Sequence, residues 1–212
     1  MANRTELYLI RHGEAENNVR KNYIAGRSNE FPLTDVGFDQ SRRLGKVLLE
    51  KGILPDRVYS SPAKRPFQTG RTALIAMGLE SMPIIEDDRL QEQETGDWTG
   101  RVATEIFTDE TLARIGELGK DFRSPNGESF NDVGARMKDW VDSIPPDDNL
   151  RTFAFTHGGA IRCLPSYMYG WTHEQTYKTQ PGNTSLSLYL HNGEDWELEY
   201  LGKDVDELEN AA

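Results

Sequence analysis

The pattern that most restricts the fold is an apolar run of strand length that leads directly into Arg-His-Gly. Residues Leu7 to Ile10 are apolar, and Arg11, His12 and Gly13 follow without a spacer. A short continuous apolar run predicts a buried strand. Because open α/β sheets bind ligands at the carboxyl ends of their strands, the pattern predicts a cation and an imidazole in a binding site.

These residue types indicate phosphoryl transfer. An imidazole nitrogen is a competent nucleophile, and a neighbouring guanidinium can bind phosphate oxygens in bidentate fashion while it disfavours protonation of the ring. We expect Gly13 to let the backbone come close to a ligand. Alone, the tripeptide is a weak signal, because a single His is more often a hydrogen-bonded structural residue.

A second run with the same pattern strengthens this interpretation. Residues 151–156 form a short apolar strand pattern that ends in His157 and two glycines. If the two runs are strands of one sheet, their imidazoles can lie side by side. A helix is expected to follow over 161–169, broken near Pro165 and Gly170.

Further short motifs follow in order along the chain. They are Asn18 after the first His-Gly, Pro32-Leu33-Thr34 with Gly37, Tyr59-Ser60-Ser61-Pro62 with Arg65 and Gln68-Thr69, Leu90 and Glu92 with Gly96, Trp98 and Gly100, Gly127-Glu128-Ser129, and Thr156-His157-Gly158-Gly159 with Arg162. Together they span residues 7 to 187 and resemble the phosphoglycerate-mutase-like branch of the histidine phosphatase superfamily. The resemblance implies a three-layer α/β/α sandwich with a mostly parallel central sheet.

The resemblance also implies a catalytic set. His12 is expected to attack phosphorus and form a phosphohistidine, while Arg11, Arg65 and His157 hold the equatorial oxygens. Glu92 aligns with the proton donor of the family, which the chemistry needs because an alkoxide is a poor leaving group. In this interpretation, the residues that flank Glu92 in the sequence do not donate a proton.

The remaining site predictions concern substrate binding. Asn18 and the backbone of Gly158 and Gly159 are expected to complete the pocket, and Arg27 can point at substrate from a polar loop. Glu94, two residues after the proton donor, is expected to be solvated or paired. No metal and no cofactor are expected, because the positive side chains can neutralise the phosphate.

The rest of the chain reads as one domain, 1–212, built on a scaffold of helices and strands. The expected elements are a helix from Thr34-Asp35 to Gly52, a helix with Pro62 at its first position, an edge strand over 83–87, a helix over 129–143, and a hairpin of 184–190 with 196–201. Residues 101–124 are expected to form a lid-like helical insertion over the site.

Charge is distributed unevenly along the chain. The net charge is −11, but residues 194–209 alone carry −7, whereas residues 11–27 carry +2. The acidic C-terminal end is expected to be a solvated, partly frayed tail. A cationic site on an acidic body argues for an anionic small-molecule partner, a phosphate ester, and against nucleic acid.

Location and assembly are less constrained. With a single cysteine, Cys163, no apolar stretch of about 20 residues and no leader pattern, we expect a cytoplasmic protein with no membrane partner. A homodimer is left open.

Three functions are consistent with the motifs. The first is a phosphatase that hydrolyses small-molecule phosphomonoesters. The second is a 2,3-bisphosphoglycerate-dependent phosphoglycerate mutase, which uses the same catalytic set; we expect mutases to carry a longer insertion before the second His, so the short chain favours the phosphatase. The third is an inactive module that binds phosphorylated ligands, which the complete catalytic set disfavours. The sequence does not identify the substrate.

Overall fold

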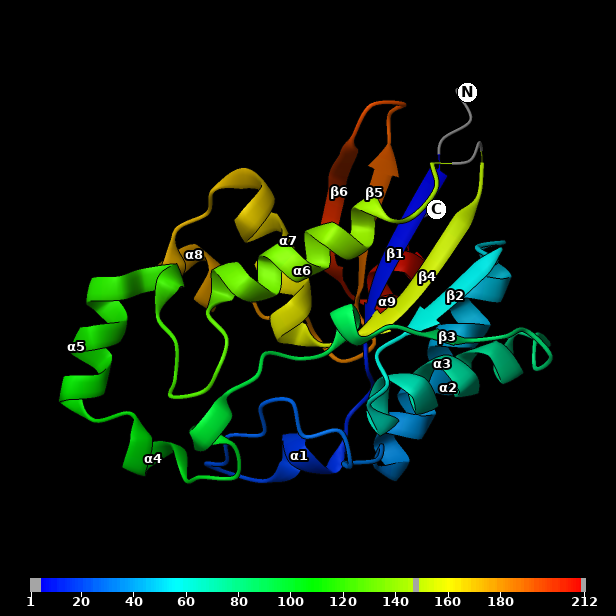
Figure 1. Ribbon diagram of the computed structural model, residues 1–212. Helices are drawn as coiled ribbons and strands as arrows, with labels where there is room; N and C mark the ends of the chain where they lie inside the picture. Colours follow the sequence, from blue (N-terminus) through cyan, green and yellow to red (C-terminus); the bar gives the residue numbers. More distant parts are fainter. Residues whose placement is uncertain (1–4, 147–148, 211–212) are drawn as a thin grey trace.

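The computed structural model describes residues 5–146 and 149–210, and in this part of the chain six strands form one mixed sheet (Figure 1). The strands are β1 (Thr5–Arg11), β2 (Arg57–Ser60), β3 (Ile85–Glu86), β4 (Arg151–Thr156), β5 (Leu186–His191) and β6 (Trp196–Lys203). Their order is β3-β2-β4-β1-β5-β6. β5 is antiparallel to both of its neighbours, β1 and β6, and the other neighbouring pairs are parallel. The edge strand β3 and the β5–β6 hairpin confirm the sequence predictions.

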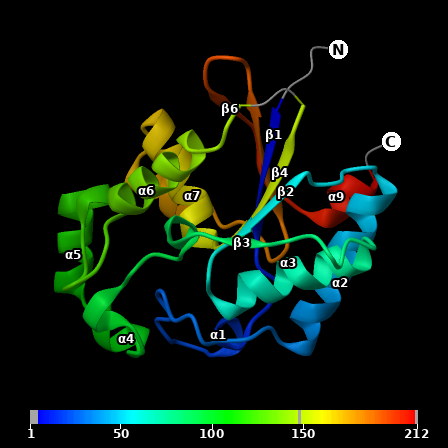
Figure 2. The same ribbon diagram turned by 45° about the vertical axis from the view of Figure 1, so that its right-hand side comes forward.

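Helices cover both faces of the sheet, as Figure 2 shows, so the fold is the expected three-layer α/β arrangement. On one face lie α2 (Asp35–Glu50), α3 (Lys64–Ala76) and α9 (Val205–Asn210); on the other lie α6 (Phe130–Asp142) and α7 (Gly158–Tyr169). Shorter helices are α1 (Glu16–Val19), α4 (Ala103–Ile106), α5 (Asp109–Leu118) and α8 (His173–Lys178).

The apolar run of β1 is continuous because the strand is buried on both faces. Leu7 and Leu9 pack into the core under α6 and α7, whereas Tyr8 and Ile10 pack into the core under α2 and α3. β1 and β4 are parallel neighbours, and Arg11 is paired with Thr156. The residues that follow, the two histidines, therefore leave adjacent strands at the same level.

Two helix starts follow from their capping residues. The Thr34 side chain accepts a hydrogen bond from the backbone N–H of Gly37 at 3.1 Å, so α2 begins where predicted. Gly52, with a φ of +65°, follows the end of α2. The Ser129 side chain and Asp132 form a capping box at the start of α6.

Two helix boundaries differ from prediction. α3 begins at Lys64 rather than Pro62, because the N–H of Ser61 still donates to Phe155 of β4 and keeps the chain extended. α7 begins at Gly158 and runs through Pro165 without a break. Pro165 is buried, so packing outweighs the loss of one helical hydrogen bond.

The prediction of a frayed acidic tail is wrong for the described residues. Residues 196–203 form β6, and Val205 and Leu208 of α9 are buried in the core. Arg43 of α2 forms ion pairs of 2.5 Å with both Asp206 and Glu209. The apolar residues, three positions apart, give α9 one face that packs, and the acids lie on its other side.

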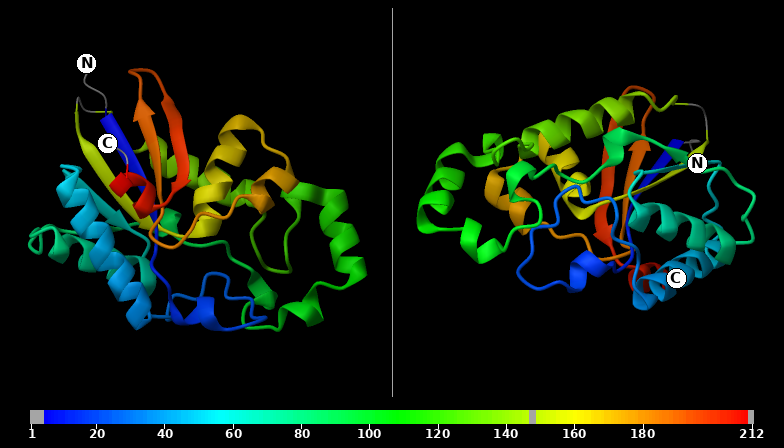
Figure 3. Two further views of the ribbon diagram at one scale, coloured as in Figure 1. Left: turned by 180° about the vertical axis from the view of Figure 1, so that it is seen from behind. Right: turned by 60° about the horizontal axis from the view of Figure 1, so that its bottom comes forward.

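The insertion at 101–124 extends away from the sheet. α4 and α5 stand apart from the layers in Figure 1, and Figure 3 shows the same segment from behind and from below. Neither helix has a fully buried residue. Within residues 5–146 and 149–210, no helix combines the length and apolar character needed to cross a membrane.

Candidate active site

A pocket of about 220 Å³ lies at the carboxyl ends of β1 and β4. We call it the catalytic pocket. Seven residues predicted for the site line it: Arg11, His12, Asn18, Arg65, Glu92, Gly158 and Gly159. Asn17, Ala25, Gly26, Gln93, Thr95, Arg162 and Gln180 complete the lining. The register of β1 and β4 explains why segments far apart in the sequence meet here.

His12 is held as a neutral imidazole with one nitrogen toward the arginines. Its side chain is 3% exposed, and Nδ1 lies 2.7 Å from the carbonyl oxygen of Gly13. A carbonyl can only accept, so Nδ1 carries the proton and Nε2 carries the lone pair. Burial, together with Arg65 and Arg11, lowers the pKa of His12 well below its usual value. The ring is therefore a nucleophile at neutral pH.

Gly13 has a different role from the one expected. A Cβ at this position would lie 2.6 Å from the backbone oxygen of Gly37 in α2. The glycine thus permits the loop after β1 to pack against a helix, and it does not line the catalytic pocket. Its N–H donates to the hydroxyl of Thr69 at 3.0 Å, which fixes this loop to α3.

His157 lies beside His12, as predicted. The ring centroids are 5.3 Å apart with an angle of 69° between the planes. His157 is fully buried, and its Nε2 is 2.9 Å from the hydroxyl of Ser61. That hydroxyl accepts from the N–H of Ala63. When its own proton is donated to Nε2, Nδ1 is the protonated nitrogen, and among the described residues it has no acceptor.

Arg65 is the most enclosed cation of the site. It is 1% exposed, and its Nε donates to Nε2 of His12 at 3.2 Å. Burial lowers the pKa of Arg65 to about 10, with Glu92 opposing and Arg11 adding to the shift, so it is charged at neutral pH. Burial likewise lowers the pKa of Arg11, and its Nη1 donates to the carbonyl of Pro181. Both cations are thus partly desolvated and attract an anion strongly.

Glu92 is oriented by two backbone N–H groups, one of them at the start of α7. Its two carboxylate oxygens accept from the N–H of Gly159 at 3.1 Å and from that of Gln93 at 2.9 Å. A Cβ on Gly159 would lie 2.1 Å from the carboxylate, so a side chain here would displace Glu92 from this position. The carboxyl group faces the same pocket as His12.

Glu94, in contrast, lies outside the catalytic pocket, as expected. It accepts from the N–H of Gly96 at 3.0 Å and lies 4.0 Å from Arg27. This pairing confirms the interpretation of Glu94 as a paired carboxylate.

Arg27 does not line the catalytic pocket. It pairs with Glu128 at 2.9 Å and donates to the carbonyl of Glu92 at 3.2 Å. Arg136 of α6 also donates to this carbonyl, at 3.0 Å, and binds both oxygens of Glu128. Glu128 thus holds two arginines that both donate to the backbone carbonyl of Glu92. Arg27 therefore positions the backbone of Glu92 from outside the catalytic pocket.

Arg162 is a site residue that the sequence analysis left without a role. It lies one helical turn after Gly158 and lines the catalytic pocket. Its Nε is buried and has no hydrogen-bond partner within the described part of the chain. The sequence signal is the spacing of four residues between Gly158 and Arg162, which places both on the same side of a helix. The expected helix start at Ile161 left Gly158 outside the helix and so hid this relation.

Buried polar atoms without partners gather at this pocket. Among the described residues they include Nε of Arg11, Nδ1 of His157, Nε of Arg162 and Oδ1 of Asn17. Such atoms are uncommon, and three of these four are N–H donors. The start of α7 adds oriented backbone N–H groups. The arrangement suits an anion with several acceptor oxygens, such as a phosphate.

Comparison with known proteins decides the family. The family model described as histidine phosphatase superfamily (branch 1) matches residues 7–204. The chain belongs to the histidine phosphatase superfamily. In the part of the chain that the structure describes, no group of three or more His, Cys, Asp or Glu residues is placed to hold a metal ion. The expectation of a metal-independent reaction stays a prediction.

Individual relatives carry both mutase and phosphatase names. The chain is 32% identical over 193 residues to a 2,3-bisphosphoglycerate-dependent phosphoglycerate mutase of Azorhizobium caulinodans, covering 86% of this chain and 90% of that protein. It is 26% identical over 199 residues to the putative phosphoserine phosphatase 2 of Hydrogenobacter thermophilus, covering 93% and 95%. Among solved structures, Bacillus stearothermophilus YhfR superposes with a TM-score of 0.79 at 28% identity, covering 94% and 97%.

These matches remove one argument for a phosphatase. The mutase-named relative is matched over nine-tenths of its length, so it is not much longer than this chain. The short chain therefore does not distinguish a phosphatase from a mutase, and the expectation based on length was wrong. The distinction has to come from the surroundings of the catalytic pocket.

Proposed function

We propose that the protein is a phosphatase that hydrolyses small-molecule phosphomonoesters through a phosphohistidine at His12. The observation that carries the proposal is the neutral His12 ring, with its Nε2 lone pair facing two partly desolvated arginines and a carboxyl group in one pocket. A nucleophile, charge-stabilising donors and a proton donor are the parts that phosphoryl transfer needs.

In the first step, Nε2 of His12 attacks phosphorus as the bond to the ester oxygen breaks. The N–H groups of Arg65, Arg11 and His157 bind the equatorial oxygens; for this, Arg65 exchanges its contact with Nε2 for one with phosphate. Protonated Glu92 gives its proton to the departing oxygen, and the alcohol leaves.

In the second step, a water molecule attacks the phosphohistidine. The Glu92 carboxylate takes a proton from the water, the bond between phosphorus and Nε2 breaks, and inorganic phosphate forms. Nδ1 of His12 keeps its proton throughout, because its hydrogen bond to the carbonyl of Gly13 persists. Glu92 returns to the protonated state that the next turnover requires.

A phosphoglycerate mutase is the second candidate, because relatives with that name match nearly the whole chain. A mutase must hold a small polyanionic sugar acid while the phosphoryl group returns to it. Next to the catalytic pocket, however, the described residues form a mainly apolar lining with Arg162 as its single permanent charge. This lining supports hydrolysis of a less polar ester.

The test is to trap the phosphoenzyme. Rapid mixing with a phosphomonoester should label a nitrogen of His12, with a phosphate that is stable in alkali and labile in acid. We expect His12→Asn to abolish the label and to lower kcat by a factor on the order of 10⁴–10⁶, as for loss of other nucleophiles. His191→Asn, at the far end of β5, serves as the control and should keep both.

The same experiment separates the two candidates. With 3-phosphoglycerate and catalytic 2,3-bisphosphoglycerate, a mutase would form 2-phosphoglycerate faster than it releases phosphate. We expect phosphate release to dominate. An unlabelled His12 in an active enzyme would refute the mechanism.

A further inference from the structure

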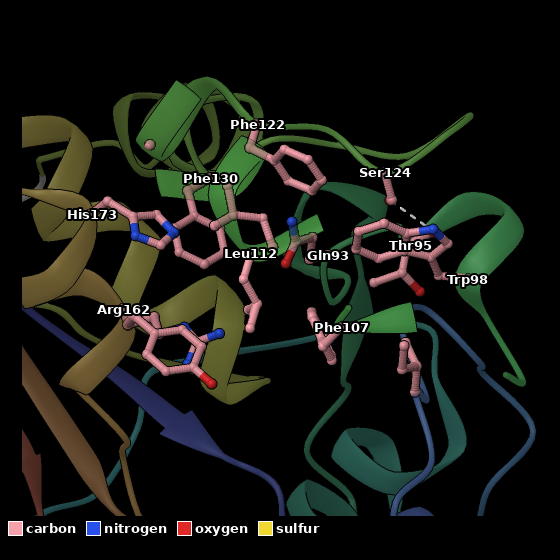
Figure 4. Close-up of a pocket in the computed structure, with 14 residues that line it drawn as sticks. Gln93, Thr95, Trp98, Phe107, Leu112, Phe122, Ser124, Phe130, Arg162 and His173 are labelled. Carbon is pink, nitrogen blue, oxygen red and sulfur yellow. Dashed lines mark hydrogen bonds between the residues drawn. The ribbon is translucent and has the colours of Figure 1, made fainter. Parts of the chain in front are cut away.

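A second, larger cavity adjoins the catalytic pocket. Its volume is about 480 Å³, and we call it the apolar cavity (Figure 4). Its lining consists of Ile24, Gln93, Thr95, Trp98, Phe107, Leu112, Ile115, Gly119, Phe122, Ser124, Phe130, Arg162, His173 and Tyr177. The volume lies in the range of pockets that enclose whole organic ligands, about 300–1,000 Å³.

The insertion at 101–124 supplies one wall of the apolar cavity. Phe107 lies in the link between α4 and α5, and Leu112 and Ile115 lie in α5. Figure 4 shows Leu112 projecting toward the middle of the lining. α5 is amphipathic but has no buried residue, and Leu112 remains 50% exposed. The apolar side of α5 thus faces a cavity and not a packed core.

Aromatic faces form the opposite walls. Phe130 and His173 stack with centroids 5.4 Å apart at 14°, and Tyr177 continues the stack 6.2 Å from His173. Burial and Arg162 lower the pKa of His173, so this ring is neutral at neutral pH. On the other side, Trp98 lies 5.5 Å from Phe122. Flat apolar surfaces of this kind favour a ligand with aromatic area.

The two spaces are direct neighbours. Gln93, Thr95 and Arg162 line both of them. The guanidinium of Arg162 lies 5.3 Å from the ring centre of Phe130 and 5.9 Å from that of Tyr177. A molecule whose phosphate lies at His12 can therefore place its organic part beside the apolar cavity, next to a cation that can contact both.

We propose that the apolar cavity is the subsite for the alcohol part of the substrate, and that this part is a large, mainly apolar group with aromatic surface. The proposal rests on the proposed phosphatase function and narrows its substrate class. It follows from shared lining residues, from the aromatic walls and from a lining in which Arg162 alone is permanently charged within the described chain.

The experiment compares two esters with nearly equal leaving-group chemistry. Ethyl phosphate and 2-(2-naphthyl)ethyl phosphate both release a primary alcohol, so a difference in kcat/KM reports binding of the organic part. Burying a bicyclic aromatic group is expected to raise kcat/KM by roughly 10²-fold. 3-Phosphoglycerate should be no better than ethyl phosphate.

A matched pair of variants locates the effect. Leu112→Asn should lower the naphthyl-to-ethyl ratio of kcat/KM by about tenfold, because it places an amide among the apolar walls. Leu118→Asn changes the same residue type on the same helix at 42% exposure, but it does not line the apolar cavity, and it should preserve the ratio. Both leucines are half exposed, so neither variant should prevent folding.

The outcomes separate the subsite from the proposed function. A naphthyl-to-ethyl ratio near one, or a ratio that Leu112→Asn leaves unchanged, overturns the subsite while the phosphatase remains. If neither ester is hydrolysed, the function fails, and calorimetry with the corresponding ethyl- and naphthylethylphosphonates decides the subsite. Equal dissociation constants for the two phosphonates would overturn it; tighter binding of the naphthyl compound, weakened by Leu112→Asn, would support it.

Discussion

The catalytic pocket and the apolar cavity adjoin each other, yet they are built in opposite ways. The first is made mainly of charged and polar groups, and key members are held by specific hydrogen bonds such as the one from Nδ1 of His12 to the carbonyl of Gly13. The second is made mainly of apolar side chains, several from an insertion whose helices α4 and α5 have no buried residue. A phosphoryl group needs fixed partners, whereas an organic group needs only a complementary apolar surface.

This contrast teaches where specificity and chemistry reside. The groups proposed to act on the phosphoryl group lie at strand ends, at helix starts and in the loops beside them, where backbone geometry positions them. One wall of the apolar cavity lies on α5 and the link that precedes it, and neither α4 nor α5 has a buried residue. We therefore expect changes in the catalytic pocket to affect all substrates alike, and changes in the apolar cavity to affect them selectively.

The largest expected effect in this comparison concerns Glu92. Glu92→Gln should lower kcat by a factor on the order of 10²–10⁴ on ethyl and naphthylethyl phosphate alike, because both alcohols need a proton. An aryl phosphate should suffer less, since its oxygen leaves without one. Steady-state rates at saturation measure this, with Glu94→Gln as the control that should resemble the parent.

Unequal losses on the two alkyl esters would mean that Glu92 also interacts with the organic part of the substrate. The catalytic pocket and the apolar cavity would then not act independently. A large loss in Glu94→Gln would move the acid role by two residues.

Arg162 tests the boundary between the regions. Arg162→Met keeps an apolar side chain of similar length but removes the charge, and we expect kcat/KM to fall about 10²-fold for both esters, as for loss of one charge-stabilising donor. Arg114→Met, an exposed residue of α5 outside both pockets, is the matched control. A loss confined to the naphthyl ester would assign Arg162 to the apolar cavity instead.

The smallest effect concerns the ionic support behind Glu92. Burial alone would raise the pKa of Glu128, but hydrogen bonds from Arg136 and from the N–H of Glu94 lower it overall. A lowered folded-state pKa stabilises the fold fully above the ordinary Glu pKa of about 4.3, and this stabilisation is lost as pH falls through the lower folded value. Glu128→Gln should cost about 1–3 kcal/mol at pH 7 and proportionately less below pH 4.

Urea unfolding at several pH values measures this dependence. The exposed Glu174→Gln, whose partner is Lys178, should leave the midpoint unchanged. Activity of Glu128→Gln should fall less than tenfold, because the network holds the backbone of Glu92 and does not touch substrate. An equal cost at pH 7 and pH 3.5 would show that the carboxylate is not the source of the stability.

Most of the architecture could be predicted from local patterns. A continuous apolar run, as in residues 7–10, has few solutions other than a strand buried on both faces, and the caps Thr34 and Ser129 mark helix starts through short-range hydrogen bonds. The predicted helix boundaries were wrong where a distant partner decides them. The hydrogen bond from the N–H of Ser61 to the carbonyl of Phe155 moves the start of α3 to Lys64, and burial keeps Pro165 inside α7.

The candidate site divides in the same way. By itself, the sequence determined the chemistry of the site, because His12, His157, Arg11, Arg65 and Glu92 have the functional groups that phosphoryl transfer needs, and their motifs occur in the order of a known family. Only the tertiary structure decided the proton positions on the two histidines, the supporting place of Arg27, the involvement of Arg162 and the existence of the apolar cavity. The contact of His12 with the adjacent Gly13 is local. The other features depend on groups from segments distant in the chain, whose distances and burial are set by packing and not by neighbours in sequence.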